Sequence, residues 1–154
     1  PLSKLFVDEI QPKTTGGIVS IPSQVSFNAH RNGGGDISSG VFIFTSTTVN
    51  IGNGFNTTTG KFTAPVSGTY FFNTTCLTTS NNGANDLQIR VDDTNVAQAR
   101  QNASSSVHNS ISVTVIATLT ANQVVHVHVS GGGGLYGGTG LYSTFCGYLI
   151  GATV

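Results

Sequence analysis

The sequence of 154 residues predicts an all-β fold, a two-sheet antiparallel sandwich of the jelly-roll type. Apolar and polar residues alternate almost throughout, as in residues 111–119, where Ile, Val, Val, Ala and Leu occupy every second position opposite Ser112, Thr114 and Thr118. No stretch keeps a 3.6-residue period over three helical turns. The predicted strands are residues 25–30, 41–44, 55–58, 68–77, 87–91, 96–100, 111–119, 125–129 and 142–151.

Turn-forming residues separate these segments. They occur at 32–35 (Asn-Gly-Gly-Gly), 52–54, 82–83, 92–93, 121–122 and 131–140. Eight or more short strands divided in this way are typical of a β-sandwich or jelly roll.

Residues 1–21 differ from the rest and are predicted to form an N-terminal arm, with a single jelly-roll domain over residues 22–154. Two short extended pieces, 5–10 and 17–21, are expected to pair as a hairpin, which is only marginally stable alone. We therefore expect the arm to become ordered against a neighbouring subunit or a larger assembly. The alternative, an unstructured leader, stays open.

The composition excludes several classes of function. With 6 basic and 6 acidic residues and no cluster of Lys or Arg, the chain lacks the positive surface that binds nucleic acid, and its apolar runs are too short to insert into a membrane. Cys76 and Cys146 lack the spacing of a metal or redox motif, so two buried thiols are favoured over a disulfide. Pro1 and the residues after it show no export signal, which indicates synthesis in a cytoplasm, although a trimmed chain would look the same.

A spaced set of aromatic and small residues begins at Phe44 and includes the run Lys-Phe-Thr-Ala-Pro-Val-Ser-Gly-Thr-Tyr-Phe-Phe at 61–72. It resembles the signature of the C1q globular-head family, relatives of the tumour necrosis factor fold. Residues 25–29 and 143–150 are similar to the opening and closing strands of that family, whereas Thr74 stands where its pattern has an aromatic residue. The likeness covers about residues 22–151. Its spacing is carried by Phe44, Asn50, Phe55, Phe62, Gly68, Tyr70 and Phe72.

This resemblance implies a homotrimer. Phe71 points away from the face that carries its neighbours Tyr70 and Phe72, and in the family such a residue is covered by adjacent subunits around a threefold axis. The aromatics expected in the core or the trimer contact are Phe44, Phe55, Phe62, Tyr70, Phe71, Phe72, Phe145 and Tyr148.

A second, shorter likeness concerns the arm. Residues 4–17, Lys-Leu-Phe-Val-Asp-Glu-Ile-Gln-Pro-Lys-Thr-Thr-Gly-Gly, are similar to leaders of virion proteins of tailed bacteriophages, some of which carry C1q-like domains. This resemblance implies that the arm binds other virion proteins.

Ligand-binding residues are expected in the longest polar loops. In an antiparallel jelly roll, loops 30–39, 79–86, 101–110 and 131–142 lie together at one end. Aromatic and polar side chains there suit a sugar, because a tyrosine face matches the apolar face of a pyranose and polar groups bind its hydroxyls. The candidates are Arg31, Asp86, His108, Tyr136 and Tyr142. The alternative, that these loops are merely solvated, stays open.

Metal binding and catalysis receive little support. His126 and His128 share one face of a strand but have no third ligand, so solvated histidines are favoured over a metal site. Asp92 and Asp93 suit calcium or a plain turn, and the plain turn is favoured. No nucleophile elbow, zinc-protease motif or phosphate loop occurs, so we expect a non-enzyme without cofactors.

Together these observations predict a trimeric structural protein of a phage virion, such as a head fibre, decoration protein or tail-fibre tip, that binds host surface glycans. The alternative is a secreted animal C1q-domain lectin of innate immunity, in which the sequons at Asn56, Asn73 and Asn102 would carry glycans. A hydrolase on a jelly-roll scaffold is the third and weakest class.

Overall fold

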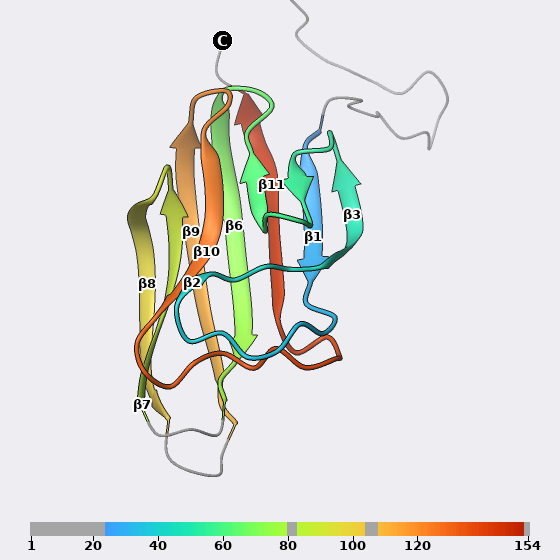
Figure 1. Ribbon diagram of the computed structural model, residues 1–154. Coiled ribbons are helices and arrows are strands. Elements are labelled where there is room, and N and C mark those ends of the chain that lie inside the picture. Colours follow the sequence, from blue (N-terminus) through green and yellow to red (C-terminus); the bar gives the residue numbers. More distant parts are fainter. Residues whose placement is uncertain (1–23, 80–82, 104–107, 153–154) are drawn as a thin grey trace, which may run out of the picture.

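The computed structural model describes residues 24–79, 83–103 and 108–152, and in them eleven strands form two sheets that pack face to face (Figure 1). The predicted arm, including the pieces 5–10 and 17–21, lies outside the described residues. The strands are β1 Ser26–His30, β2 Gly40–Val41, β3 Ser46–Ile51, β4 Phe55–Asn56, β5 Lys61–Thr63, β6 Gly68–Leu77, β7 Gly83–Val91, β8 Thr94–Ala103, β9 Ser110–Leu119, β10 Val124–Ser130 and β11 Thr144–Ala152.

One sheet has five strands in the order β3-β1-β11-β6-β9, and every neighbouring pair is antiparallel. The other has six elements: β4-β5-β10-β7-β8 form a continuous path, and β2 pairs with β10 beside it. The predicted two-sheet antiparallel sandwich is therefore confirmed. In each long strand the period-two pattern places one set of side chains between the sheets and the other set outside.

Aromatic rings fill the space between the sheets. Phe27 lies at the centre: its ring centroid is 4.8 Å from that of Phe55, 5.0 Å from that of Phe62 and 5.0 Å from that of Phe145. Because β1 and β11 belong to one sheet and β4 and β5 to the other, the contacts of Phe27 with Phe55 and Phe62 join the two layers. The aromatics of the sequence pattern that are buried here are Phe44, Phe55, Phe62, Tyr70, Phe72 and Phe145.

Thr74 fills the position where the family pattern has an aromatic residue. Its side chain is fully buried, and its hydroxyl donates a hydrogen bond to the carbonyl of Thr144 on the neighbouring strand at 2.9 Å. The hydroxyl is thus satisfied inside the core, which removes most of the cost of burying it.

The strands differ from those predicted in several places. β3 was not expected, because Ser46–Ile51 consists mainly of Ser, Thr and Asn and lies at a sheet edge. β5 was also missed as a separate strand. The strand predicted at 41–44 ends at Val41, although Phe42 and Phe44 beyond it are completely buried.

The predicted strand at 55–58 ends early because Asn56 starts a turn. Its side-chain oxygen accepts hydrogen bonds from the backbone N–H groups of Thr58 at 2.8 Å and Thr59 at 3.2 Å, and its backbone carbonyl accepts one from Gly60. Such a side-chain-to-backbone arrangement competes with the strand ladder.

The loops divide between the two ends of the sandwich. Loop residues 31–39, 78–79, 108–109 and 131–143, here called the loop end, lie at the bottom of Figure 1. The start of β1 and the end of β11 lie at the opposite end, because Ser26 pairs with Tyr148 and Gly68 pairs with Ala152. The β7–β8 hairpin also points toward that end (Figure 1). The chain therefore enters and leaves the domain at the end farthest from these loops.

The two cysteines lie on opposite faces of the five-stranded sheet. Cys76 faces the core, where burial raises the pKa of its thiol to about 12, whereas Cys146 faces outward opposite Asn73. A disulfide between them would require one strand to turn over, so this geometry supports two thiols.

Gly147 gives a test of the aromatic core. A Cβ at this position would lie 2.5 Å from the ring of Phe72 and 2.8 Å from that of Phe27, whereas a Cβ at Gly151 on the same strand has open space. We expect Gly147→Ala to reduce the free energy of unfolding by about 1–3 kcal/mol, because the packed rings must move. Urea titrations at one fixed chain concentration measure it, with Gly151→Ala as the matched control. Equal stability of the two variants would contradict the proposed packing.

Candidate functional site

The segment 131–143 is held firmly across the loop end. Leu135 is completely buried and forms bridges with both Ile37 and Thr78. Hydrogen bonds of 2.7 and 3.0 Å join the backbones of Leu135 and Ile37, and the N–H of Tyr136 donates to the carbonyl of Leu77 at 2.8 Å. The segment thus extends the ladder beyond the ends of the strands, which explains how a glycine-rich stretch holds one conformation.

Three rings that the sequence analysis selected meet on this support. The centroid of Tyr136 lies 5.2 Å from that of His108 and 6.3 Å from that of Tyr142, both with edge-to-face geometry. Tyr142 is 58% exposed, and Leu141 beside it is 72% exposed. We call His108, Tyr136 and Tyr142 the aromatic cluster.

Two glycines of the segment leave the space that the rings of Tyr136 and Tyr142 occupy. A Cβ on Gly138 would collide with the ring of Tyr136, and one on Gly140 would lie 2.7 Å from the ring of Tyr142. Gly140 also has φ +118°, a backbone conformation that residues with a side chain rarely adopt. Glycine at these two positions is therefore a packing requirement.

His108 is oriented by the backbone. Its Nδ1 lies 2.6 Å from the carbonyl oxygen of Thr78. A carbonyl can only accept, so Nδ1 must carry the proton, and in the neutral ring Nε2 is left as an acceptor.

Arg31 does not belong to this surface, contrary to expectation. It is only 3% exposed, and its guanidinium donates to the carbonyls of Ile43 at 2.6 Å and Gly35 at 2.7 Å while lying 4.8 Å from the ring centroid of Phe42. Burial lowers the pKa of this guanidinium below its usual value. Arg31 holds the loop end together from inside.

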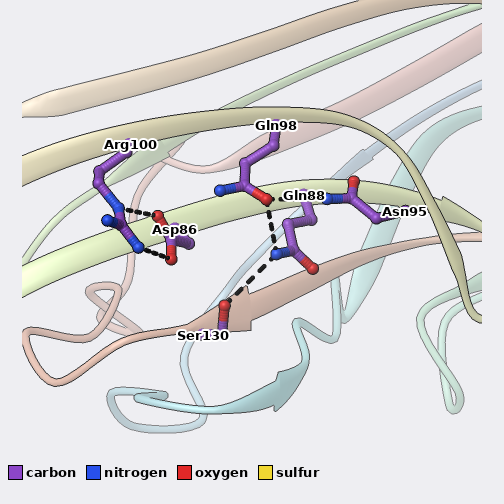
Figure 2. A network of polar contacts seen from close by, with 6 residues as sticks. All are labelled: Asp86, Gln88, Asn95, Gln98, Arg100 and Ser130. Carbon is purple, nitrogen blue, oxygen red and sulfur yellow. Dashed lines mark hydrogen bonds and ion pairs between the residues drawn. The ribbon is translucent and has the colours of Figure 1, made fainter.

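Asp86 is also placed elsewhere. It lies on the outer face of the six-stranded sheet and forms a two-pronged ion pair with Arg100 at 2.6 and 2.7 Å, which lowers the pKa of the carboxyl (Figure 2). Figure 2 also shows a separate group of polar contacts on the same sheet, in which Gln88 donates to Gln98 at 2.9 Å. Asp86 is committed to its neighbours and does not face the aromatic cluster.

The expectation of solvated histidines is wrong for His126, whose side chain is 1% exposed. It stands on the outer face of the six-stranded sheet, paired with Lys61 on β5 and Arg90 on β7. Nε2 of His126 lies 3.6 Å from a carboxylate oxygen of Asp93, and neither ring nitrogen has a hydrogen bond. Alternation correctly predicts that the ring points outward, but it does not show that neighbouring side chains cover it.

The metal-ligand candidates of the sequence are His126, His128, Asp92 and Asp93. Among residues 24–79, 83–103 and 108–152, no three His, Cys, Asp or Glu residues are grouped so as to hold a metal ion. Asp92 and Asp93 form the two-residue turn between β7 and β8 with φ of 46° and 64°, as the plain-turn interpretation predicts. Asp92 accepts hydrogen bonds from the N–H of Val124 and the side chain of Gln123.

A second candidate surface is the outer face of the five-stranded sheet. None of its five strands contains Lys, Arg, Asp or Glu. A row of paired residues crosses all five strands near the end opposite the loop end, and we call it the apolar row: Ile51, Ser26, Tyr148, Phe71 and Ile116.

Phe71 is half-buried and its ring stacks on that of Tyr148 at 5.1 Å, while Ile51 and Ile116 are exposed. The resemblance selected Phe71 and Tyr148 but missed the two isoleucines. Their signal is the register, because Ile116 pairs with Phe71 and so shares its face.

All Lys, Arg, Asp and Glu residues of the described strands lie on the six-stranded sheet. Lys61, Asp86, Arg90 and Arg100 are on the six-stranded sheet, and Asp92 and Asp93 are in its hairpin. The two outer faces are therefore chemically different: one is charged and the other has no formal charge.

These features define a class of β-sandwich binding module with one uncharged sheet face and an aromatic loop end. The C1q domain family matches residues 26–150, and the chain belongs to this family. Domains of this kind are generally non-enzymatic binding modules and typically form homotrimers. No curated protein matches the chain.

Two solved structures show the same fold. The globular domain of the zebrafish complement 1qA protein aligns with a TM-score of 0.70 and 20% identity, covering 84% of this chain and 99% of that one. The Eiger TNF from S. frugiperda aligns with a TM-score of 0.67 and 13% identity, covering 86% of this chain and 96% of that one. Both matches support the predicted relationship to C1q and TNF folds.

In the described part of the chain, no helix has the length and apolar character needed to cross a bilayer.

His126 predicts a loss of stability in acid. Burial of the ring, and after it the positive charge of Lys61, holds the pKa of His126 below its usual value, while Asp93 acts in the opposite direction. Below about pH 6.5 the unfolded chain therefore binds the proton more readily, so stability falls as the pH falls through this range. His128 and Arg90 face the same ring and add to the effect.

We expect Tm to decrease from pH 7.5 to pH 5, and His126→Gln to remove much of this decrease. In a chain of this size, each kcal/mol lost from the free energy of unfolding lowers Tm by about 2–4 °C. Differential scanning fluorimetry at fixed chain concentration measures it. His128→Gln, at a half-buried position two residues away, is the control and should remove less. An unchanged pH dependence in His126→Gln would refute the assignment.

Proposed function

We propose that this protein is a non-enzymatic, homotrimeric structural protein of a tailed-bacteriophage virion that displays a C1q-like domain and binds host surface glycans with its loop end. The observation that carries the proposal is the uncharged outer face of the five-stranded sheet. Interfaces are depleted of charge at their centre, and an exposed row of Ile, Tyr and Phe on a sheet face is stabilised when a second copy covers it.

The two ends of the domain support a display role. Both connections to the rest of the chain leave from the end opposite the loop end (Figure 1). Three copies joined along their five-stranded sheets would place their entry points together at one end and their aromatic clusters at the other. An assembly bound at the first end would then present the second to its surroundings.

The assignment to a virion rests on the resemblance of residues 4–17 to phage leaders. One structural observation favours it over the alternative. Asn73 lies on the outer face of the five-stranded sheet and donates to Thr114 Oγ1 at 2.8 Å. A glycan attached at its sequon would stand in the proposed trimer contact.

The alternative function is a secreted animal C1q-domain lectin. Asn56 and Asn102 are exposed and would accept glycans without disturbing that contact. The two functions predict different gene surroundings: neighbouring capsid and tail genes for the virion protein, and an upstream signal peptide for the lectin. Immunogold labelling of phage particles that carry the gene would then test its place directly, and unlabelled particles would refute the virion role.

Native mass tests the trimer. We expect the full chain to have three times its mass of 15.9 kDa, and Phe71→Asp to give monomers, because each copy would bury an unpaired carboxylate in the contact at a cost of about 3–5 kcal/mol. Light scattering coupled to gel filtration measures this. Val96→Asp, at an exposed site on β8 of the six-stranded sheet, is the control and should stay trimeric. A Phe71→Asp protein that remains trimeric would show that another face makes the contact.

A further inference from the structure

The loop end combines an exposed aromatic surface with a particular charge. Tyr142 and Leu141 are adjacent and exposed, and the half-buried Tyr136 contacts Tyr142 edge to face. Rigid aromatic side chains supply contact area at a low cost in conformational entropy. Here the rings are set before any ligand arrives, because glycines fit around them and Leu135 anchors the segment.

Two hydrogen-bond acceptors lie on the loops of the same end, one on His108 and one on Asp36. In the neutral ring of His108, Nε2 is an acceptor, because Nδ1 carries the proton that is donated to Thr78. Asp36 is exposed, and one of its carboxylate oxygens accepts the N–H of Gly137, which directly follows Tyr136. The carboxylate is therefore held beside the aromatic cluster.

The same region offers no exposed cation. Among the described residues of the loop end the charged side chains are Arg31 and Asp36, and Arg31 is buried with its guanidinium bonded to two carbonyls. The loop segments 80–82 and 104–107 contain no charged residue in the sequence. The exposed formal charge of the described loop end is thus negative.

We propose that the aromatic cluster, with Asp36, is a binding site selective for neutral sugars, in which Tyr142 stacks against the apolar face of a pyranose while His108 and Asp36 accept hydrogen bonds from its hydroxyls. This inference rests on the proposed glycan-binding function and specifies its ligand class. Sugars that carry a carboxylate, such as sialic or glucuronic acid, are disfavoured because Asp36 repels them and no exposed cation compensates.

The test measures binding of the full chain to monovalent methyl glycosides. Saturation-transfer NMR detects the binding, and titration gives the affinity. The neutral probes are the methyl glycosides of galactose, glucose, mannose and N-acetylglucosamine, and the acidic probes are those of sialic and glucuronic acid. We expect at least one neutral probe to bind more tightly than both acidic probes. Tyr142→Ala should weaken that binding by about tenfold or more, because it removes the stacking surface.

Asp36→Asn separates charge from shape. We expect this variant to bind the neutral probe more weakly, because a carboxylate acceptor is lost. The difference in affinity between the neutral and the acidic probes should become smaller, because the repelling charge is gone. Asp93→Asn is the matched control: Asp93 is 79% exposed in the β7–β8 hairpin at the opposite end, so its replacement should change neither affinity.

The native mass of each sample is also measured, so that a failure of the sugar-binding inference can be distinguished from a failure of the proposed trimer. Trimers that bind no sugar would overturn this inference and the glycan-binding part of the proposed function, but leave the structural role. Trimers that prefer the acidic probes would overturn the neutral selectivity alone. A protein that is not trimeric would overturn the proposed assembly, whatever it binds.

Discussion

The stacking of Phe27 against Phe55 and Phe62 determines much of what this molecule presents to its surroundings. The contact joins β1 of one sheet to β4 and β5 of the other, and it fixes which residues of β1 face the core. Side chains alternate strictly along a strand, so Ser26 on its other side must point outward. The register then carries this choice across the sheet, from Ser26 to Tyr148, Phe71 and Ile116. A single slip of one residue would place polar groups in the core and phenylalanine in solvent.

With the inner faces committed to aromatic packing, the outer faces are free to differ, and they do. One has ion pairs and amide contacts such as those from Asp86 to Arg100 and from Gln88 to Gln98. The other has hydroxyls, amides and an apolar row without formal charge. Few of the 154 residues are charged, so this division is a matter of placement and not of abundance. A face without formal charge and a face with ion pairs are thus built on one core.

The sequence predicts the architecture well because alternation, turns and aromatic spacing are local patterns. It misses β3, where Ser-Thr-Thr gives no alternation and the strand is recognisable only through its pairing with β1. For the loop end it selects three rings, His108, Tyr136 and Tyr142, that the structure brings together, because aromatic residues in long polar loops can be recognised in the sequence. It fails for Arg31 and Asp86, because whether a charged side chain is free depends on the carbonyls or guanidinium that the fold places beside it. The burial of His126 is of the same kind: it arises from strands that are distant in the sequence.

The close packing of the glycine-rich segment also limits how the loop end can change over evolution. A side chain at Gly137 would collide with the carbonyl of Gly35, and one at Gly138 would displace Tyr136. Sequence changes at this end should therefore be tolerated best at the outward residues, such as Leu141 and Thr139, while the glycines are kept. The exposed chemistry of this end can thus change at a few positions while the backbone that supports it stays the same.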